Sequence, residues 1–426
     1  MDVYILNQNL DTVYVVDAYT SLIWDMYYNQ LGRGELYVPA SAEALQYITV
    51  ESYVVRSDSD RVCRIRTRQL TTDAENGDYI IATLEAVEGI LAQRIIWATE
   101  TCNGKLEPFI HRAVDDQLGS GATSARQIRT DHGLLIQTGT LSGLTAVSSE
   151  QTTYTNLLDK IFEWCKREGW GVKLTYQGTY LRFNLYQGTD RSNLVYFSDE
   201  YGNLISTQYT DDRSRLGNVA VIAGEGQGAE RLKITTGSSE GIARHEKYID
   251  ARDLSREIPY SDLIKSYPGG TIQATAEPDV YIYVADVDIP VMSSEQLAKL
   301  QESYPDGYEI EIDSKEFYRV ERATIAALAT DTPGDSETCV LSSGLYYGYL
   351  TDRGITALGE YGAVTSFSGE IEPNMNFEFG RDYFLGDIVT IQNEYGITVK
   401  ARIIEVLEVF DENGYQVTPN FELIGE

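Results

Sequence analysis

The first hundred residues alternate between short apolar runs and polar turns, a pattern typical of β-strands. The runs VYIL and VYVVD within residues 3–17 flank a turn-like stretch at 7–11, which predicts an opening β-hairpin. A short helix is expected at 86–94, where apolar residues recur at helical spacing. Residues 1–105 therefore predict a first small β-barrel closed by that helix. Its further strands are expected at 35–38, 53–56, 62–70 and 79–84.

A change of pattern after residue 105 predicts a unit of mixed structure. The clearest helical period of the chain lies at 155–168, and alternation resumes at 172–186 around a Gln-Gly turn. We therefore expect an α+β unit over 106–190. The apolar stripe of its helix comprises Leu158, Ile161, Phe162 and Cys165.

Strand-like runs return at 194–225 and again at 383–409, separated by a segment that has turn and helix-start signals of its own. That segment contains Ser293 followed by Gln296, a capping box that predicts a helix start. The fold class expected is mainly β with α+β insertions: two small tube-type β-barrels plus two smaller α+β units. The second barrel is assigned to 191–260 and 363–426, and the inserted α+β unit to 261–362.

Composition supports β structure and excludes several classes of function. The chain has 31 Tyr, 11 Phe and 4 Trp, and aromatic residues favour strands and half-buried surfaces. It carries 65 acidic against 34 basic residues, so its formal net charge is −31. This excess of carboxylates repels phosphate, so we expect no stable binding of nucleic acid or of an anionic membrane.

Sequence motifs give no sign of a cofactor, a metal or a membrane anchor. The four cysteines and three histidines are scattered, without the spacings that hold zinc. No stretch approaches the roughly 18 apolar residues of a membrane span, and the first ten residues do not resemble a signal peptide. Buried, reduced thiols and a soluble protein without cofactor or metal are therefore expected.

Catalytic signatures are also missing, apart from carboxylates at strand spacing. There is no G-x-S-x-G elbow and no Walker A loop. Alternation would place Asp286 with Asp288, and Glu309 with Glu311 and Asp313, on single strand faces. Paired carboxylates and many tyrosines would suit a carbohydrate-binding or carbohydrate-active β-protein, which is the alternative interpretation. In a chain with 65 acids such pairs arise by chance, so no enzyme is expected.

A run of arginines, RVCRIRTR at 61–68, is unusual in so acidic a chain. Strand alternation would place Arg64, Arg66 and Arg68 on one face, opposite Cys63, Ile65 and Thr67. Arginines in this setting pair with carboxylates, either within the chain or across a subunit interface. The three arginines are therefore the candidate interface residues.

Five strings stand in order along nearly the whole chain: TSLIWDMYYNQLGRGELYVPAS at 20–41, LEAVEGILAQRII at 84–96, LVYFSDEYGNLISTQYTDDRSRLGNVAVIAGEG at 194–226, YIDARDLS at 248–255 and YFLGDIVTIQNEYGITVKARIIEVLEVFDENG at 383–414. Together they resemble one family, the siphovirus-type tail proteins of phages and prophages of Gram-positive bacteria. The first string is similar to that family's S-x-I-W string and the strand after it, the second to the segment that closes its first barrel, and the last to its L-G-D-x-V strand and return strand.

The resemblance implies a structural baseplate or tail-tip hub in which two small barrels lie side by side. Three chains would then place six barrels around a channel, in a homotrimeric ring that caps the tail tube. The implied partners are the distal tail protein, the tail tube and tape-measure proteins, and receptor-binding or fibre proteins. The implied location is the phage virion, after assembly in the bacterial cytoplasm. A channel that passes DNA should not bind phosphate, which agrees with the charge of −31.

Overall fold

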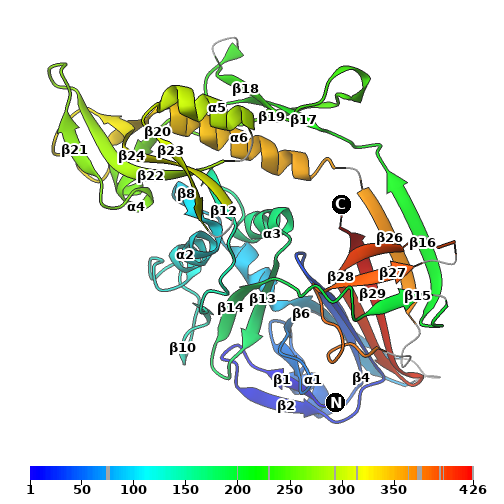
Figure 1. The fold of residues 1–426 in the computed structure, drawn as a ribbon. Helices are drawn as coiled ribbons and strands as arrows, with labels where there is room; N and C mark the ends of the chain where they lie inside the picture. Colours follow the sequence, from blue (N-terminus) through cyan, green and yellow to red (C-terminus); the bar gives the residue numbers. More distant parts are fainter. Residues whose placement is uncertain are drawn as a thin grey trace.

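The computed structural model describes the chain except for residues 73–76, 199, 229–230, 292–293, 313–314, 363, 372–376, 393–394, 397 and 425–426. The helix start predicted at Ser293 lies outside the described residues. The described part is mainly β, as the sequence predicted, and also contains six α-helices (Figure 1).

Seven strands at the start of the chain pair in the order β3-β4-β7-β6-β5-β1-β2. Alternation drives their formation: side chains of β7 are buried and half-buried in turn, since every second residue faces the core. The predicted opening hairpin is confirmed as β1 with β2, and the predicted short helix is the 3₁₀ helix η1 (Val87–Gln93). The strands are β1 (Val3–Leu6), β2 (Thr12–Val16), β3 (Ser21–Tyr27), β4 (Arg33–Pro39), β5 (Tyr53–Arg56), β6 (Val62–Thr71) and β7 (Tyr79–Ala86), with helix α1 (Ala42–Tyr47) after β4.

The first strands of the chain and the last ones belong to one sheet. β28 pairs antiparallel with β3, in a register from Glu405 opposite Tyr27 to Phe410 opposite Leu22. Figure 1 shows these red and blue strands side by side. The resulting sheet has 13 strands. Its second group comprises β15 (Tyr196–Ser198), β16 (Leu204–Asp212), β26 (Val364–Ile371), β27 (Ile388–Gln392), β28 (Thr398–Asp411) and β29 (Gly414–Leu423).

A helical layer lies above the first strand group. The helix predicted at 155–168 is confirmed as α3 (Leu157–Glu168); the Asn156 side chain caps its first turn, and Gly169 ends it with φ +65°. The predicted second hairpin is β13 with β14. The remaining elements are β8 (Glu100–Lys105), α2 (Leu106–Leu118), β9 (Arg129–Thr130), β10 (Gly133–Leu134), β11 (Ile136–Thr138), β12 (Val147–Thr152), β13 (Gly171–Tyr176) and β14 (Leu181–Tyr186).

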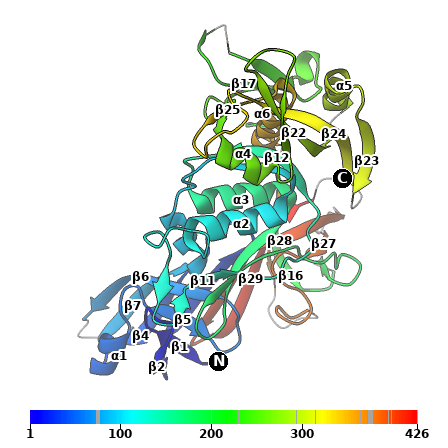
Figure 2. The same ribbon diagram turned by 90° about the vertical axis from the view of Figure 1, so that its left-hand side faces the viewer.

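The upper part of the molecule contains two further sheets (Figure 2). One has the order β18-β17-β19, so the strands of 219–250 pair with one another and not with the large sheet; the other has six strands around β24 and β22. The division into four units stays a prediction. The elements are β17 (Val219–Ala223), β18 (Lys233–Thr236), η3 (Gly241–Ala243), β19 (Glu246–Asp250), β20 (Glu257–Pro259), α4 (Tyr260–Ser266), β21 (Thr271–Ala274), β22 (Tyr281–Pro290), α5 (Ser294–Ser303), β23 (Tyr308–Ile312), β24 (Lys315–Leu328), β25 (Thr338–Leu341) and α6 (Ser343–Gly359).

The molecule has three tiers: the large sheet, the helical layer above it (the middle tier) and the two further sheets with their helices (the upper tier). Each tier has its own hydrophobic core. Trp24 and Phe197 lie in the core of the large sheet, which thus draws on both strand groups. Trp164 lies in the core under α2 and α3, and Tyr346 in the upper core. The four cysteines are buried and free, as predicted. Because each tier has its own core, the contacts between tiers decide how rigid the whole chain is.

Candidate functional site

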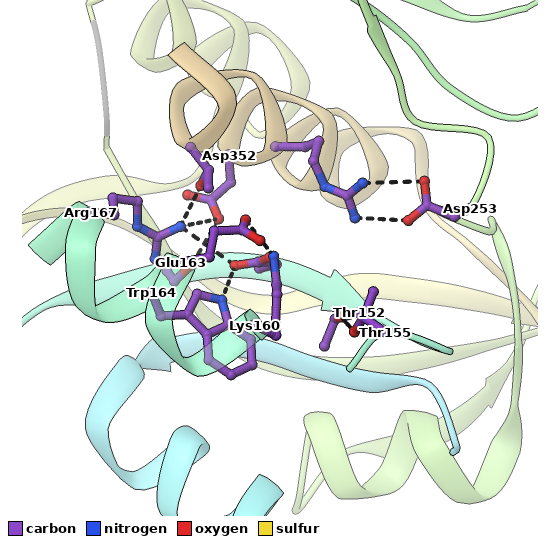
Figure 3. A network of polar contacts seen from close by, with 12 residues as sticks. Thr152, Thr155, Lys160, Glu163, Trp164, Arg167, Asp253 and Asp352 are labelled. Carbon is purple, nitrogen blue, oxygen red and sulfur yellow. Dashed lines mark hydrogen bonds and ion pairs between the residues drawn. The ribbon is translucent and has the colours of Figure 1, made fainter. Parts of the chain in front are cut away.

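The densest group of buried charges lies where α6 meets β12 and α3 (Figure 3). Glu150 on β12 and Asp352 on α6 have side chains only 1% and 2% exposed, and Lys160 and Arg167 approach them from α3. Charges of opposite sign thus come from the middle tier and the upper tier. Removing one member would leave an uncompensated buried charge, so this group couples the two tiers strongly.

Arg167 is the centre of this group. Its Nη1 lies 3.3 Å from Oδ2 of Asp352 and 3.5 Å from Oε2 of Glu150. The same nitrogen donates to the Thr356 hydroxyl on α6 at 2.6 Å, and Nη2 donates to the Ser148 hydroxyl on β12 at 3.1 Å. One guanidinium therefore holds two elements to its own helix, a geometry that its rigid fork of donors permits.

The remaining contacts satisfy Glu150 and extend along α3. Lys160 Nζ forms an ion pair with Oε1 of Glu150 and another with Glu163 at 2.7 Å. The indole of Trp164 donates to Oε2 of Glu150 at 2.7 Å. Burial favours the neutral acid, but the charges of Lys160 and Arg167 outweigh it and hold the pKa of Glu150 below its usual range. Glu150 is therefore a permanent anion at neutral pH.

A second buried ion pair joins the two strand groups of the large sheet. Arg56 on β5 is 3% exposed and donates to both carboxylate oxygens of Glu408 on β28, at 2.9 and 3.0 Å. It donates equally to both oxygens of Asp58 at 3.0 Å, and the Phe410 ring centroid lies 4.6 Å from its guanidinium. The Tyr415 hydroxyl completes the set by donating to Glu408 at 2.9 Å.

A third junction is built around the buried Tyr28, just after β3. Its hydroxyl donates to the Gly169 carbonyl at 3.0 Å and accepts from the Gly188 N–H at 3.1 Å. Gly386, with φ +97°, packs so closely that a Cβ there would lie 2.3 Å from the tyrosine ring. Three segments thus meet at the Tyr28 ring: the end of α3, the connection after β14 and the loop before β27. The close packing there explains why glycines occupy these segments.

An open cleft of about 560 Å³ lies beside these junctions, between the two strand groups. Its charged side chains already have partners: Arg61 with Glu88, Lys173 with Asp60, and Arg191 with Asp387. Asp58 and Glu408, which also line the cleft, share Arg56 as their partner. In the described part of the chain, no three His, Cys, Asp or Glu side chains are grouped so that they could hold a metal ion.

The arginine run does not keep the predicted separation of faces. The register between β6 and β7 shifts between Ile65 and Thr67, and residues 62–65 are buried on both sides, since they lie between two cores. Arg64 is 4% exposed and pairs with Glu51 at 3.3 Å and Glu85 at 2.9 Å. Arg66 pairs with the same two carboxylates as Arg64, Glu51 at 2.7 Å and Glu85 at 3.5 Å, so the pairing with carboxylates of the chain that the sequence allowed is present.

The outer part of the same run remains accessible. Arg66 is 42% exposed and pairs with Glu51 at 2.7 Å, and the exposed Arg68 donates to the carbonyls of Leu45 and Ile48 at 2.9 and 3.1 Å. All three arginines thus have partners within the chain. That the three arginines also contact another subunit stays a prediction.

Three of the five carboxylates predicted to share strand faces make structural contacts. Both oxygens of Asp288 accept from Arg319 at 2.6 Å, and Asp286 accepts from the Arg322 N–H at 2.8 Å. Glu309 accepts from Gln301 at 3.1 Å, and Asp313 lies outside the described residues. Neither set therefore offers a free pair of acids in the described structure.

Sequence reasoning missed the buried ion pairs, although one of them left a signal. Lys160 occupies the inner stripe of α3, three residues after Leu157 and four before Trp164. A lysine at such a position needs a buried partner. The partners Glu150 and Asp352 carry no comparable signal, because nothing local distinguishes them among 65 acids.

Comparison with known proteins finds one matching family and several similar solved structures. The family model of siphovirus ReqiPepy6 Gp37-like proteins matches residues 2–421, whereas no curated protein matches the chain. Similar solved structures include the 43 kDa tail protein of prophage MuSo2 from Shewanella oneidensis, at 10% identity and TM-score 0.49, covering 99% of this chain and 98% of that one. Another is the prophage tail protein gp18 from Listeria monocytogenes EGD-e, at 12% identity and TM-score 0.44, covering 99% and 94%.

The resemblance to siphovirus-type tail proteins in five strings is thereby confirmed across the length of the molecule. The matched range includes both strand groups, the helical layer and the upper sheets. None of the described helices is long and apolar enough to cross a bilayer. The chain belongs to the family of siphovirus ReqiPepy6 Gp37-like proteins, a family of phage tail proteins.

Proposed function

We propose that this tail protein is a structural hub of the tail tip or baseplate. Three copies form a ring that caps the tail tube and connects it to distal tail components. The observation that carries the proposal is the pairing of β3 with β28, which sets two strand groups side by side in one chain. Each group acts as one tube-type barrel, so three chains present six such units around a channel.

The role of such a hub is geometric, so its parts must keep fixed relative positions. The Arg56 pair with Glu408 and the packing around Tyr28 support this for the strand groups. The contacts of Arg167 support it for the upper tier. Buried pairs of this kind contribute little net stability against apolar residues of the same shape, but they penalise any other arrangement.

The proposal includes partners and a location. The partners are the distal tail protein, the tail tube and tape-measure proteins, and receptor-binding or fibre proteins. The chain would reside at the tail tip of the virion after assembly in the host cytoplasm. Its charge of −31 suits a channel wall along which DNA slides, because carboxylates repel phosphate. Arg64, Arg66 and Arg68 remain the candidate interface residues.

The test is the oligomeric state of the purified full chain, alone and with its tail-tube partner. Light scattering should give the mass of three chains at high protein concentration, and negative-stain images should show rings with a central opening. A strictly monomeric mass together with the absence of rings beside the tube partner would overturn the proposal. Hydrolysis of peptidoglycan or oligosaccharides by the monomer would favour the carbohydrate-active alternative.

A further inference from the structure

An exposed group of aromatic and basic side chains stands out on the middle tier. Trp97, which follows η1, is 64% exposed; Tyr154, after β12, is 73% exposed; and Ile95 is 40% exposed. The Tyr154 N–H donates to the Ile96 carbonyl at 2.8 Å, which fixes the two segments side by side. These residues, with Arg94 and Arg126, are called the Trp97 patch below.

Two arginines are locked together at this patch. Arg94 Nε donates to the Arg126 carbonyl at 2.9 Å, and Arg126 Nη2 donates to the Ile95 carbonyl at 2.6 Å. The Arg126 guanidinium lies 5.7 Å from the Trp97 ring centroid. Neither arginine forms an ion pair with a carboxylate of the described residues, whereas most arginines of this acidic chain do. Burial and the neighbouring charge of Arg94 lower the pKa of Arg126, as expected for like charges held together.

The backbone at Tyr154 adds an independent sign that this surface has a use. Its φ is +51°, a left-handed conformation that costs a tyrosine free energy that a glycine would avoid. The conformation turns a large aromatic side chain into solvent. Exposed Trp, Tyr and Arg are the residue types that dominate the binding free energy of protein interfaces.

Charge complementarity identifies the occupant. The patch offers two cations without carboxylate partners, so it fits a surface that supplies carboxylates around apolar side chains. A second copy of this chain is such a surface, since each copy carries 65 acids and a net charge of −31. A basic patch that meets an acidic face elsewhere on the next copy makes a head-to-tail contact, which forms a ring when the rotation between copies closes.

We propose that the Trp97 patch docks against an acidic face of a second copy of this chain. The inference rests on the proposed self-association and names the surface that carries it. Arg94 and Arg126 supply the cations of the contact, and Trp97 with Tyr154 supply its apolar centre. Nucleic acid is disfavoured as the occupant, because the rest of the chain would repel phosphate.

The experiment compares variants of the patch with variants of equally exposed positions elsewhere on the full chain, by sedimentation equilibrium. The double variant R94Q/R126Q and the control R213Q/R252Q both have a net charge of −33, that is −31 minus two. Arg213 and Arg252 are 71% and 66% exposed and lie outside the patch. For the apolar centre, W97A is matched with I242A, because Ile242 is fully exposed.

We expect the dissociation constant to rise at least tenfold for R94Q/R126Q and for W97A, with both controls within twofold of the parent chain. W97A should leave the melting curve unchanged, because Trp97 is 64% exposed. R94Q/R126Q removes two hydrogen bonds from half-buried side chains to backbone carbonyls, so circular dichroism of this double variant checks that it remains folded. Trimers that form equally well in patch variants and controls would overturn the patch and leave the proposed ring intact. A parent chain that stays monomeric at every concentration, with and without the tube partner, would overturn both.

Discussion

Glu100, at the start of β8, shows how the fold acts on a single ionisable group. Burial, and secondarily the charge of Asp116, raise its pKa to about 7, although Arg112 and Lys265 partly offset them. Its Oε1 accepts one hydrogen bond from Gln117 at 3.2 Å. The carboxylate is thus held where its charged form is disfavoured, between the middle tier and the upper tier.

This shift makes stability depend on pH in a defined direction. The pKa is higher in the folded chain than the ordinary value of 4.5, so the folded state binds the proton more tightly. Protonation of Glu100 should therefore stabilise the fold as pH falls from about 8 through 7 toward 4.5, by up to about 3 kcal/mol. Melting temperatures measured across this range should rise accordingly.

The variant E100Q provides the control for this pH effect. A neutral side chain of the same size should raise the melting temperature at pH 8 and leave it nearly unchanged at pH 5. The rise with falling pH should also become flatter than in the parent chain. A variant whose melting profile stays parallel to that of the parent between pH 5 and 8 would contradict the assignment to Glu100.

Replacement of Arg56 by an apolar residue removes a buried cation and should lower the stability of the fold. The variant R56M leaves Glu408, which is 7% exposed, without its bidentate partner, so the fold should lose about 3–5 kcal/mol. The double variant R56M/E408L should recover most of that loss, because no buried charge is then left alone. Thermal melting of both variants measures the difference.

An exposed ion pair supplies the comparison for Arg56. Arg381 is 66% exposed and pairs with Glu378 and Asp382, so R381M should leave the melting temperature almost unchanged. Equal destabilisation by R56M and R381M would show that burial of the pair is not the cause.

At the scale of single elements, α6 has a glycine placed for packing against the sheet of β17. A Cβ on Gly354 would lie 2.5 Å from the Ile222 side chain and 2.7 Å from that of Thr236. Alanine favours helices by about 1 kcal/mol over glycine, but the overpacking should cost about 1–3 kcal/mol. We therefore expect G354A to lower the melting temperature despite its better helix propensity.

The same helix contains a control position for Gly354. A Cβ on Gly359 would meet nothing within 4 Å, so G359A should be neutral or slightly stabilising. The sign of the two melting shifts separates packing from propensity. Stabilisation by both substitutions would mean that α6 can move away from β17 without cost.

The sequence predicted elements well where the signal is local. The hairpin within 3–17, the helix at 155–168 and the hairpin at 172–186 follow from periodicity and turn residues, and all three are present. The regular alternation predicted for β6 is interrupted after Ile65, because the register with β7 shifts there and a second core lies behind the strand. The pairing of β3 with β28 has no local signal, since the partners are hundreds of residues apart.

At the scale of the whole molecule, net charge controls how copies meet. Chains at −31 repel one another at low ionic strength, over a screening length of about 30 Å at 0.01 M salt. At physiological salt this length is about 8 Å, so the repulsion between copies is largely removed while direct contacts at an interface remain. Association of the full chain should therefore strengthen from about 0.01 to 0.15 M salt.

Light scattering at fixed protein concentration across this salt range measures that effect. Sodium chloride and potassium chloride should act alike, since the cause is screening and not the binding of a particular ion. A mass that falls steadily as salt rises would mean that attraction between complementary charges outweighs the net repulsion.

The β3–β28 pairing also sets the timing of folding on the ribosome. About 370 residues separate the end of β3 at Tyr27 from the start of β28 at Thr398, and their synthesis takes on the order of 20–70 s. During that interval the edge of β3 that β28 will cover is an open template for wrong strand pairing. The last strands to be translated therefore close the sheet that the first ones began, so a nascent chain must be shielded from other copies until translation is nearly complete.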